Sequence, residues 1–474
     1  MRTLSERAAL PSLVGLVLAT LSGCVDESVV QRDSDLFDDP PTAAQGFLGY
    51  SDQAGKLTVC GNCHVEKQSE WEQTHHANAW STLQNSGEAE ASCEACHTVN
   101  ANGNAVTGDA GWVATQDTRF QDVQCEACHG PGLEHVSNPQ EANIPLASVA
   151  VGLEATNGCG ECHRNVHHPF LQEWEASAHS NLYPSVAARD ECSACHTGNG
   201  AMDAWGVQSV FVEELSGSDY PITCAVCHDP HGGPHGKQLR FRIDTPSVEA
   251  NLCMKCHQRL GSPDLQDSSA GPHSPQGPLL LGTAGWWPPN LQWTTIVSSH
   301  GTPAVNPRLC AGCHVVPFDV TDTATGEFVV EATGHIFSPI PCLDDDGRPI
   351  ARGNCSDSQR SFVACAASGC HTDEDAARSA KAGAEARIAQ LRGALGSLLD
   401  LVPAAEFDEN DNRYTTAEGA DFNRKLARGG AHVHNPFLTE TLLIASIEAV
   451  RGQYGVTQQS LVSLTPALKP GGTD

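Results

Sequence analysis

The sequence is poor in basic residues, in aromatic residues and in methionine. Lys and Arg number 27 against 57 Asp and Glu, so the formal net charge is −30. A chain this acidic lacks the basic face that neutralises nucleic-acid phosphates or anionic membrane surfaces. Aromatic residues make up 5% of the chain, and only three Met occur in 474 residues. Because large apolar side chains normally build a core, we expect something other than side chains to fill the interior.

Long apolar runs are also missing, since no segment approaches the roughly 20 apolar residues of a transmembrane helix. One short run, residues 13–21, follows Arg2 and Arg7 and is typical of a bacterial export signal. It ends in a lipobox-like Leu-Ser-Gly before Cys24, although an ordinary signal peptide cut nearby would leave Cys24 as a spare thiol. We therefore expect a signal peptide over 1–23 and a lipoprotein anchored by a lipid on Cys24. The expected location is the outer membrane, on its periplasmic or cell-surface face.

The chain is rich in cysteine and histidine, with 21 Cys and 22 His. Eight C-x-x-C pairs occur, and each is followed at once by His. Neither a zinc ribbon nor a disulfide framework requires that His. C-x-x-C-H is the attachment site of c-type haem, in which two thiols form thioethers and the imidazole ligates iron. The predicted haem sites are Cys60/Cys63/His64, Cys93/Cys96/His97, Cys125/Cys128/His129, Cys159/Cys162/His163, Cys192/Cys195/His196, Cys224/Cys227/His228, Cys253/Cys256/His257 and Cys310/Cys313/His314.

A ninth haem site is predicted at Cys365, Cys370 and His371, which have the less common C-x4-C-H spacing. The alternative is a disulfide between two of Cys342, Cys355, Cys365 and Cys370. If the ninth site holds haem, Cys342 and Cys355 are left over, and they are expected to pair in an oxidising compartment.

Each iron needs a ligand on its second face. Methionine is almost excluded, because beyond residue 23 the chain has only Met202 and Met254, and Met254 lies inside a haem motif. Thirteen histidines lie outside the nine motifs, in nine groups along the chain. Nine groups for nine irons predict bis-histidine coordination throughout, without assigning partners. The groups are His75/His76, His135, His167/His168, His179, His231/His235, His273, His300, His335 and His432/His434.

An internal repeat links the first six motifs. Cys60 to Cys159, Cys93 to Cys192 and Cys125 to Cys224 each span 99 positions. Each unit also carries an amphipathic stretch, Gln68–Trp80 or Leu171–Tyr183, in which Trp and His are four or five positions apart. We interpret each stretch as a short helix that places Trp against the porphyrin and His on an iron, or that packs on an apolar core.

This organisation predicts six regions and a mainly α fold with extensive loops and little or no β-sheet. Two helices are expected near the C-terminus, one with apolar residues from Ile388 to Val402 and one starting at Asn435-Pro436, with His434 at its mouth. The last ten residues are expected to be a disordered tail. The regions are a signal peptide (1–23), an acidic linker (24–41), two three-haem modules (42–150 and 151–250), a loop-rich three-haem region (251–371) and a helical C-terminal region with a tail (372–474).

The pattern resembles the bacterial multihaem c-type cytochromes, particularly those of the doubled-CXXCH type, over about Cys60 to Tyr454. Besides the haem motifs, the resemblance rests on CEACHGPG at Cys125–Gly132, CHDPHG at Cys227–Gly232, VHNP at Val433–Pro436 and the W-x-x-(T/S) stretches. The resemblance implies a loop-rich chain wrapped around closely packed haems. It also implies that His135 and His231 are distal ligands of neighbouring haems.

Two functions fit these observations. The first is electron transfer through about nine bis-histidine haems, with redox-partner proteins or periplasmic or extracellular acceptors as partners and no nucleic acid. The second is a reductase or oxidase of small nitrogen or sulfur compounds, which needs one iron with an open face. The histidine count favours the first, and the sequence contains no C-x-x-C-K variant. We also expect the chain not to fold without haem, as for small metal-dependent domains.

Overall fold

The computed structural model describes residues 46–468, with gaps at 152–157, 165–167, 208–209, 323, 351–354, 368–370, 412 and 458–462. The predicted signal peptide, the lipid site at Cys24 and the acidic linker therefore lie outside the described residues, as do His167 and Cys370. The described residues belong to a single unit, Pro40–Asp474. Within the described residues, no helix is both long enough and apolar enough to cross a bilayer.

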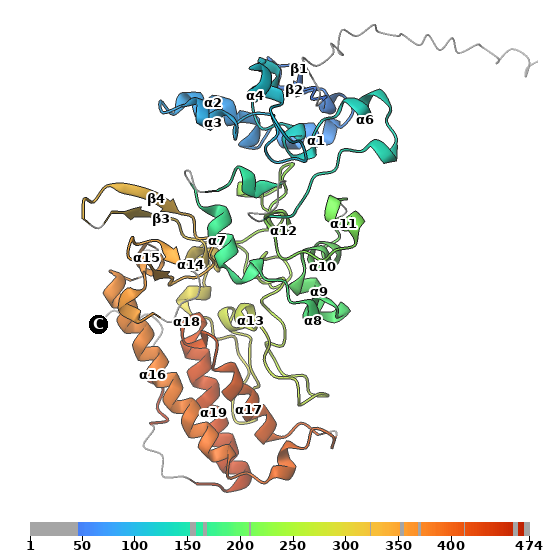
Figure 1. Ribbon diagram of the computed structural model, residues 1–474. Helices are drawn as coiled ribbons and strands as arrows, with labels where there is room; N and C mark the ends of the chain where they lie inside the picture. Colours follow the sequence, from blue (N-terminus) through green and yellow to red (C-terminus); the bar gives the residue numbers. More distant parts are fainter. Residues whose placement is uncertain are drawn as a thin grey trace, which may run out of the picture. The chain divides into compact units, whose positions relative to one another are not determined.

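The fold is mainly helical, with 43% helix and 7% strand, which confirms the predicted class. Up to residue 367 the helices are only four to seven residues long and are joined by loops (Figure 1). Several begin or end within a haem motif, so the motifs shape the local backbone. These helices are α1 (Val65–Trp71), α2 (Ala79–Asn85), α3 (Ala91–Glu94), α4 (Gly111–Thr115), α5 (Cys125–His129), α6 (Leu133–Ser137), α7 (Phe170–Ala176), α8 (Pro184–Ala187), α9 (Asp190–His196), α10 (Gly198–Ala204), α11 (Val212–Ser216), α12 (Cys224–Cys227), α13 (Gln276–Leu280), α14 (Ala311–His314) and α15 (Val363–Ala367).

The strands of the described residues form three antiparallel pairs, and two of them lie in the region between residues 318 and 350, which the sequence analysis interpreted as loop. The longest pair is β3 with β4, in which Phe318 lies opposite Ala332. Its second strand leads directly into Thr333 and His335. The pairs are β1 (Tyr50–Asp52) with β2 (Leu57–Thr58), β3 (Phe318–Thr321) with β4 (Phe328–Ala332), and β5 (Cys342–Leu343) with β6 (Pro349–Ile350).

The two repeat units share their hydrogen bonds as well as their sequence spacing. Trp71 in α1 donates its indole N–H to the Val123 carbonyl at 2.9 Å. Trp174 in α7 donates to the Ile222 carbonyl at 2.8 Å, 99 positions after Val123. Both indoles are buried, so the tryptophans fasten each helix to the segment before the third motif of its own unit.

The predicted continuous helix from Trp to His is wrong in both units, because the helix ends before the histidine. The hydroxyl of Thr74 donates to the Trp71 carbonyl at 2.7 Å, and Ser177 makes the same bond to Trp174. A hydroxyl that takes a backbone carbonyl of the last turn competes with the helix. The histidines then lie on separate 3-10 turns, His76–Asn78 and Ala178–Ser180.

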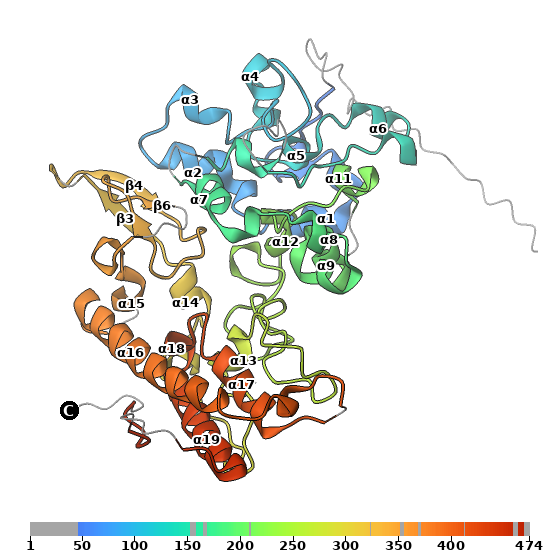
Figure 2. The same cartoon turned by 60° about the horizontal axis from the view of Figure 1, so that its bottom comes forward.

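The four remaining helices, all near the C-terminus, are α16 (Glu374–Leu399), α17 (Thr416–Leu426), α18 (Ala431–His434) and α19 (Pro436–Tyr454). Figures 1 and 2 both show α16, α17 and α19 side by side. Leu391 and Leu395 of α16 are fully buried, as the three- and four-residue spacing predicts, and they belong to the same core cluster as Leu443 of α19. A buried Arg387–Glu440 ion pair at 2.7 Å links the same two helices.

The predicted start of α19, the predicted end of α16 and the predicted tail can each be compared with the structure. Asn435 caps α19 by accepting the Leu438 N–H, which confirms the prediction for Asn435-Pro436. Val402 is buried, yet it follows the end of α16. The predicted disordered tail is wrong for residues 465–468, because Glu440 accepts the N–H groups of Ala467 and Leu468.

Candidate functional site

One continuous cavity of about 3660 Å³ contains most of the predicted haem residues. Ordinary ligand pockets measure roughly 300–1,000 Å³, so the space is far larger than a single small-molecule site. Cysteines and histidines of the second to ninth motifs line it. The first motif differs, since Cys63 and His64 are exposed to solvent.

Eight of the motif histidines each face a second histidine ring from another part of the chain. The distance between ring centres is nearly constant, from 6.0 to 6.4 Å, although the angle between the ring planes varies from 8° to 67°. The pairs are His64–His135, His129–His231, His163–His76, His196–His273, His228–His335, His257–His179, His314–His434 and His371–His300.

This constant distance fits one metal ion between each pair of rings. A metal–imidazole bond is about 2 Å long, and the ligating nitrogen lies about 1.2 Å from the ring centre, so two rings on opposite sides of one metal have centres about 6.4 Å apart. Direct ring stacking does not explain the spacing, because the angles between planes differ so widely. The residues present therefore fit haem iron with a histidine on each face.

The pairs also select one member from each doubled histidine group. His76 faces His163, His231 faces His129 and His434 faces His314, whereas His75, His235 and His432 take no part in the eight pairs.

His97 is the exception among the motif histidines. The described part of the chain sets no second histidine ring opposite it. The one predicted ligand group left over is His167/His168. His167 lies outside the described residues, and His168 forms an ion pair with Glu331 at 3.4 Å.

Backbone carbonyls orient many of the rings through Nδ1. The Nδ1 atoms of His129, His228 and His314 lie 2.7–2.8 Å from carbonyl oxygens. A carbonyl can only accept, so each Nδ1 carries the proton and Nε2 presents its lone pair, as an iron ligand must. The same arrangement holds His97 on Ala79, His300 on Val433 and His434 on Gly430.

Burial keeps several of these histidines uncharged. It lowers the pKa of His76, His335 and His434 to about 4 in each case. At neutral pH their rings are therefore neutral imidazoles, which is the form that binds a metal.

Thiols of different motifs lie close enough to shift each other's pKa. A hydrogen bond to Cys125 and then burial raise the pKa of Cys60, while the same bond lowers the pKa of Cys125 to about 7. Each thiol belongs to a different predicted haem, so the attachment points of neighbouring haems adjoin. The pairs are Cys60–Cys125, Cys96–Cys162, Cys159–Cys224, Cys195–Cys256 and Cys253–Cys310.

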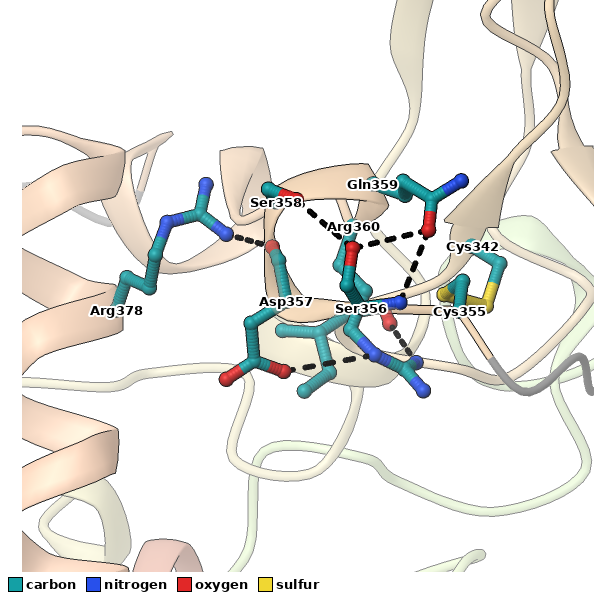
Figure 3. The surroundings of a disulfide bond; sticks show 9 residues. Cys342, Cys355, Ser356, Asp357, Ser358, Gln359, Arg360 and Arg378 are labelled. Atoms are coloured by element: carbon teal, nitrogen blue, oxygen red, sulfur yellow. Dashed lines mark hydrogen bonds and ion pairs between the residues drawn. A yellow bond between two sulfur atoms is a disulfide. The ribbon is translucent and has the colours of Figure 1, made fainter.

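The structure assigns the disulfide among the four late cysteines. Cys342 and Cys355 are bonded to each other, as expected if the ninth site holds haem (Figure 3). Cys365 is partly buried and lines the cavity with His371. The disulfide alternative for Cys365 with Cys342 or Cys355 is therefore contradicted.

Basic side chains gather along this cavity although the chain is acidic. Arg164, Arg189, Arg242, Arg259 and Arg308 are among its lining residues. Guanidinium groups bind carboxylates strongly, and each haem carries two propionates. The basic residues that the chain does possess therefore fit the acidic edges of the predicted cofactor.

Sequence reasoning missed one residue within a motif. Glu126 stands between Cys125 and Cys128, is fully buried, and accepts the backbone N–H groups of Leu48, Gly49 and Gly132 at 2.8–3.1 Å. Burial raises its pKa to about 6 against the lowering effect of those bonds. It fastens the start of the described chain to the third motif. The variable positions of C-x-x-C-H carry no signal for such a role.

Two comparisons with known families match parts of the chain. Residues 59–130 match the family of cytochrome c554 and c-prime. Residues 220–262 match the doubled CXXCH motif. The first match spans the first three haem motifs, and the second contains the sixth and seventh. No curated protein and no solved structure matches the chain.

Proposed function

We propose that this multihaem c-type cytochrome carries electrons along nine haems, each held between two histidines. The observation that carries the proposal is the set of eight histidine pairs at 6.0–6.4 Å. Haem c supplies one-electron oxidation and reduction when it is bound. The paired histidines would hold each iron from both faces, and sites filled in this way would exchange electrons without binding a substrate.

The thiol contacts support a continuous path. Cys60 adjoins Cys125 in the third motif, and Cys128 of that motif interacts with Cys159 in the fourth. Cys159 adjoins Cys224 of the sixth motif. Cys227 of that motif interacts with Cys253 of the seventh, and Cys253 adjoins Cys310 of the eighth. The first, third, fourth, sixth, seventh and eighth motifs thus follow one another, with the second joined to the fourth and the fifth to the seventh.

The ninth motif joins this series through its partner histidine. His300 donates its Nδ1–H to the Val433 carbonyl, and the residue after Val433, His434, faces His314 of the eighth motif. One short segment therefore holds ligands of two neighbouring sites. This contact, together with the His300–His371 pair, supports a ninth haem at the C-x4-C-H site.

The second candidate function is reduction or oxidation of a small nitrogen or sulfur compound. The described residues provide no histidine opposite His97, and an iron held there with one free face could bind a substrate. If His167 or His168 ligated the same iron as His97, this site would have two histidine ligands like the other eight.

Protein-film voltammetry of the haem-loaded full-length protein distinguishes the two functions. For the conduit, the film exchanges electrons with all its haems, and nitrite, hydroxylamine and tetrathionate leave the current unchanged. A catalytic current with one of these compounds that disappears in His97→Ala would support the enzyme and contradict the conduit.

We place this electron transfer at the bacterial cell envelope, with a lipid on Cys24 as the membrane anchor. The net charge of −30 would steer cationic or metal-bearing redox partners towards the protein. Growth with labelled palmitate should label the protein and leave it in the outer-membrane fraction, and Cys24→Ser should abolish both. Label retained in Cys24→Ser would overturn the anchor.

A further inference from the structure

A side-chain hydroxyl, and not a backbone carbonyl, lies against Nδ1 of His335. This Nδ1 lies 3.0 Å from the hydroxyl of Thr333, whereas several other ligand histidines meet a backbone carbonyl. The Thr333 hydroxyl in turn lies 2.7 Å from a carboxylate oxygen of Glu173. Glu173 belongs to α7, 160 positions earlier in the chain, so the contact joins the second repeat to the β3–β4 hairpin.

The protons in this chain of bonds can be placed. An ionised carboxylate only accepts, so the single hydroxyl hydrogen of Thr333 points to Glu173. Thr333 can then only accept from His335, and Nδ1 must carry the proton. The lone pair of Nε2 is left free, and the ring faces His228 with centres 6.4 Å apart.

Glu173 also holds the backbone around this histidine. It accepts the N–H groups of Thr333 and His335, both at 2.7 Å, in addition to the Thr333 hydroxyl. Its side chain is buried, with 4% of its surface exposed. Among the described residues no Lys, Arg or His forms an ion pair with it. Burying a carboxylate without a cation is costly, and the donors that offset this cost in the described part of the chain are the two N–H groups and the Thr333 hydroxyl.

The first repeat has a different arrangement at the corresponding site, the His129–His231 pair. Glu70 precedes Trp71 as Glu173 precedes Trp174, but it pairs with Lys67 at the surface. The matching ligand, His231, places Nδ1 3.3 Å from the carboxylate of Asp229. In the first repeat the Asp229 carboxylate lies directly against His231. In the second, the Glu173 carboxylate reaches His335 through the Thr333 hydroxyl.

We propose that Glu173 is a positioning residue that, through Thr333, fixes the orientation and basicity of His335 as an iron ligand. The proposal rests on the proposed function, in which His228 and His335 ligate one haem. An acceptor on the outer nitrogen makes a metal-bound imidazole more electron-rich and holds its ring plane. This strengthens the ligand, favours ferric iron and lowers the reduction potential of that haem.

The test uses the holoprotein and two readouts besides electron transfer: EPR of the oxidised form and carbon monoxide binding to the reduced form. His335→Ala first identifies the haem, because one low-spin signal should become high-spin. Glu173→Gln and Thr333→Val should shift the g values of that same signal. They should also make its iron bind carbon monoxide about tenfold more tightly, as expected for a weakened ligand.

Matched variants separate positioning from general damage. Thr333→Ser keeps the hydroxyl and Glu70→Gln alters the surface counterpart, so both should match the wild type, with haem content unchanged in all variants. Wild-type EPR and carbon monoxide binding in both Glu173→Gln and Thr333→Val would overturn the positioning role while leaving the ligand pair intact. If His335→Ala changes no low-spin signal, the ligand pair itself is contradicted.

Discussion

His75 and His76 are neighbours in sequence, yet their surroundings differ. His76 is half-buried and faces His163 at 6.1 Å, whereas His75 is exposed. The sequence predicts that this group supplies one ligand, but it cannot say which residue turns inward. The choice depends on where α1 ends, and Thr74 sets that end through its bond to Trp71.

The doubled histidines therefore provide a test at single residues. His76→Ala should convert about one ninth of the ferric iron from low-spin to high-spin, because the haem of the fourth motif loses its second ligand. His75→Ala is the matched control and should leave the EPR spectrum unchanged. Equal spectra for the two variants would contradict the assignment of His76.

Glu126 gives a second prediction at this scale. Its carboxylate accepts N–H groups from Leu48, Gly49 and Gly132 in a buried position, and an amide cannot accept on both arms. Glu126→Gln should lower the free energy of unfolding by about 1–3 kcal/mol. Thermal melts measure the change, with the exposed Glu134→Gln as control. An unchanged melting temperature for Glu126→Gln would refute the anchoring role.

Among the secondary-structure elements, long periodic helices could be predicted and short ones could not. The apolar spacing in α16 and the cap at Asn435 follow from local sequence, and both are present. The β3–β4 hairpin was missed, because Phe328 is largely exposed and its strand lacks the alternation that marks a half-buried strand. The break after Trp71 depends on one hydroxyl, which a helical pattern does not show.

Asn435 connects an element to the site. Besides capping α19, its amide donates to the carbonyls of Leu279 and Ile296, and it directly follows His434. Asn435→Ala should cost about 1–3 kcal/mol of stability and shift the EPR signal of the His314–His434 haem. Denaturation and EPR measure the two effects, and the exposed Asn410→Ala is the control. A stable variant with a wild-type spectrum would contradict this link.

For the whole molecule, the sequence predicted the kinds of residue in the site but not their pairing. Motif spacing predicts haem attachment within each repeat. The partner histidines come from neighbouring units: His76 of the first faces His163 of the second, and His179 of the second faces His257. Neither repeat therefore contains all its own ligands. The module boundaries stay a prediction from the sequence repeat, and the described residues lie in one unit.

The cavity predicts a dependence on haem for folding. A space of about 3660 Å³ is too large for side chains to close, so the chain should not reach this fold when haem is not attached. Circular dichroism of protein made without haem maturation should show far less helix than the mature protein. Cooperative thermal unfolding from a helical haem-free state would contradict this expectation.

The most direct test of the account is haem stoichiometry combined with iron ligation. Pyridine haemochrome analysis of quantified protein, followed by EPR of the oxidised form, should give nine haems per chain, all low-spin. A count of eight haems would mean that Cys365 and His371 do not hold a haem. A high-spin fraction near one ninth would indicate an open iron, for which His97 is the first candidate, and would contradict the account of a chain of bis-histidine haems.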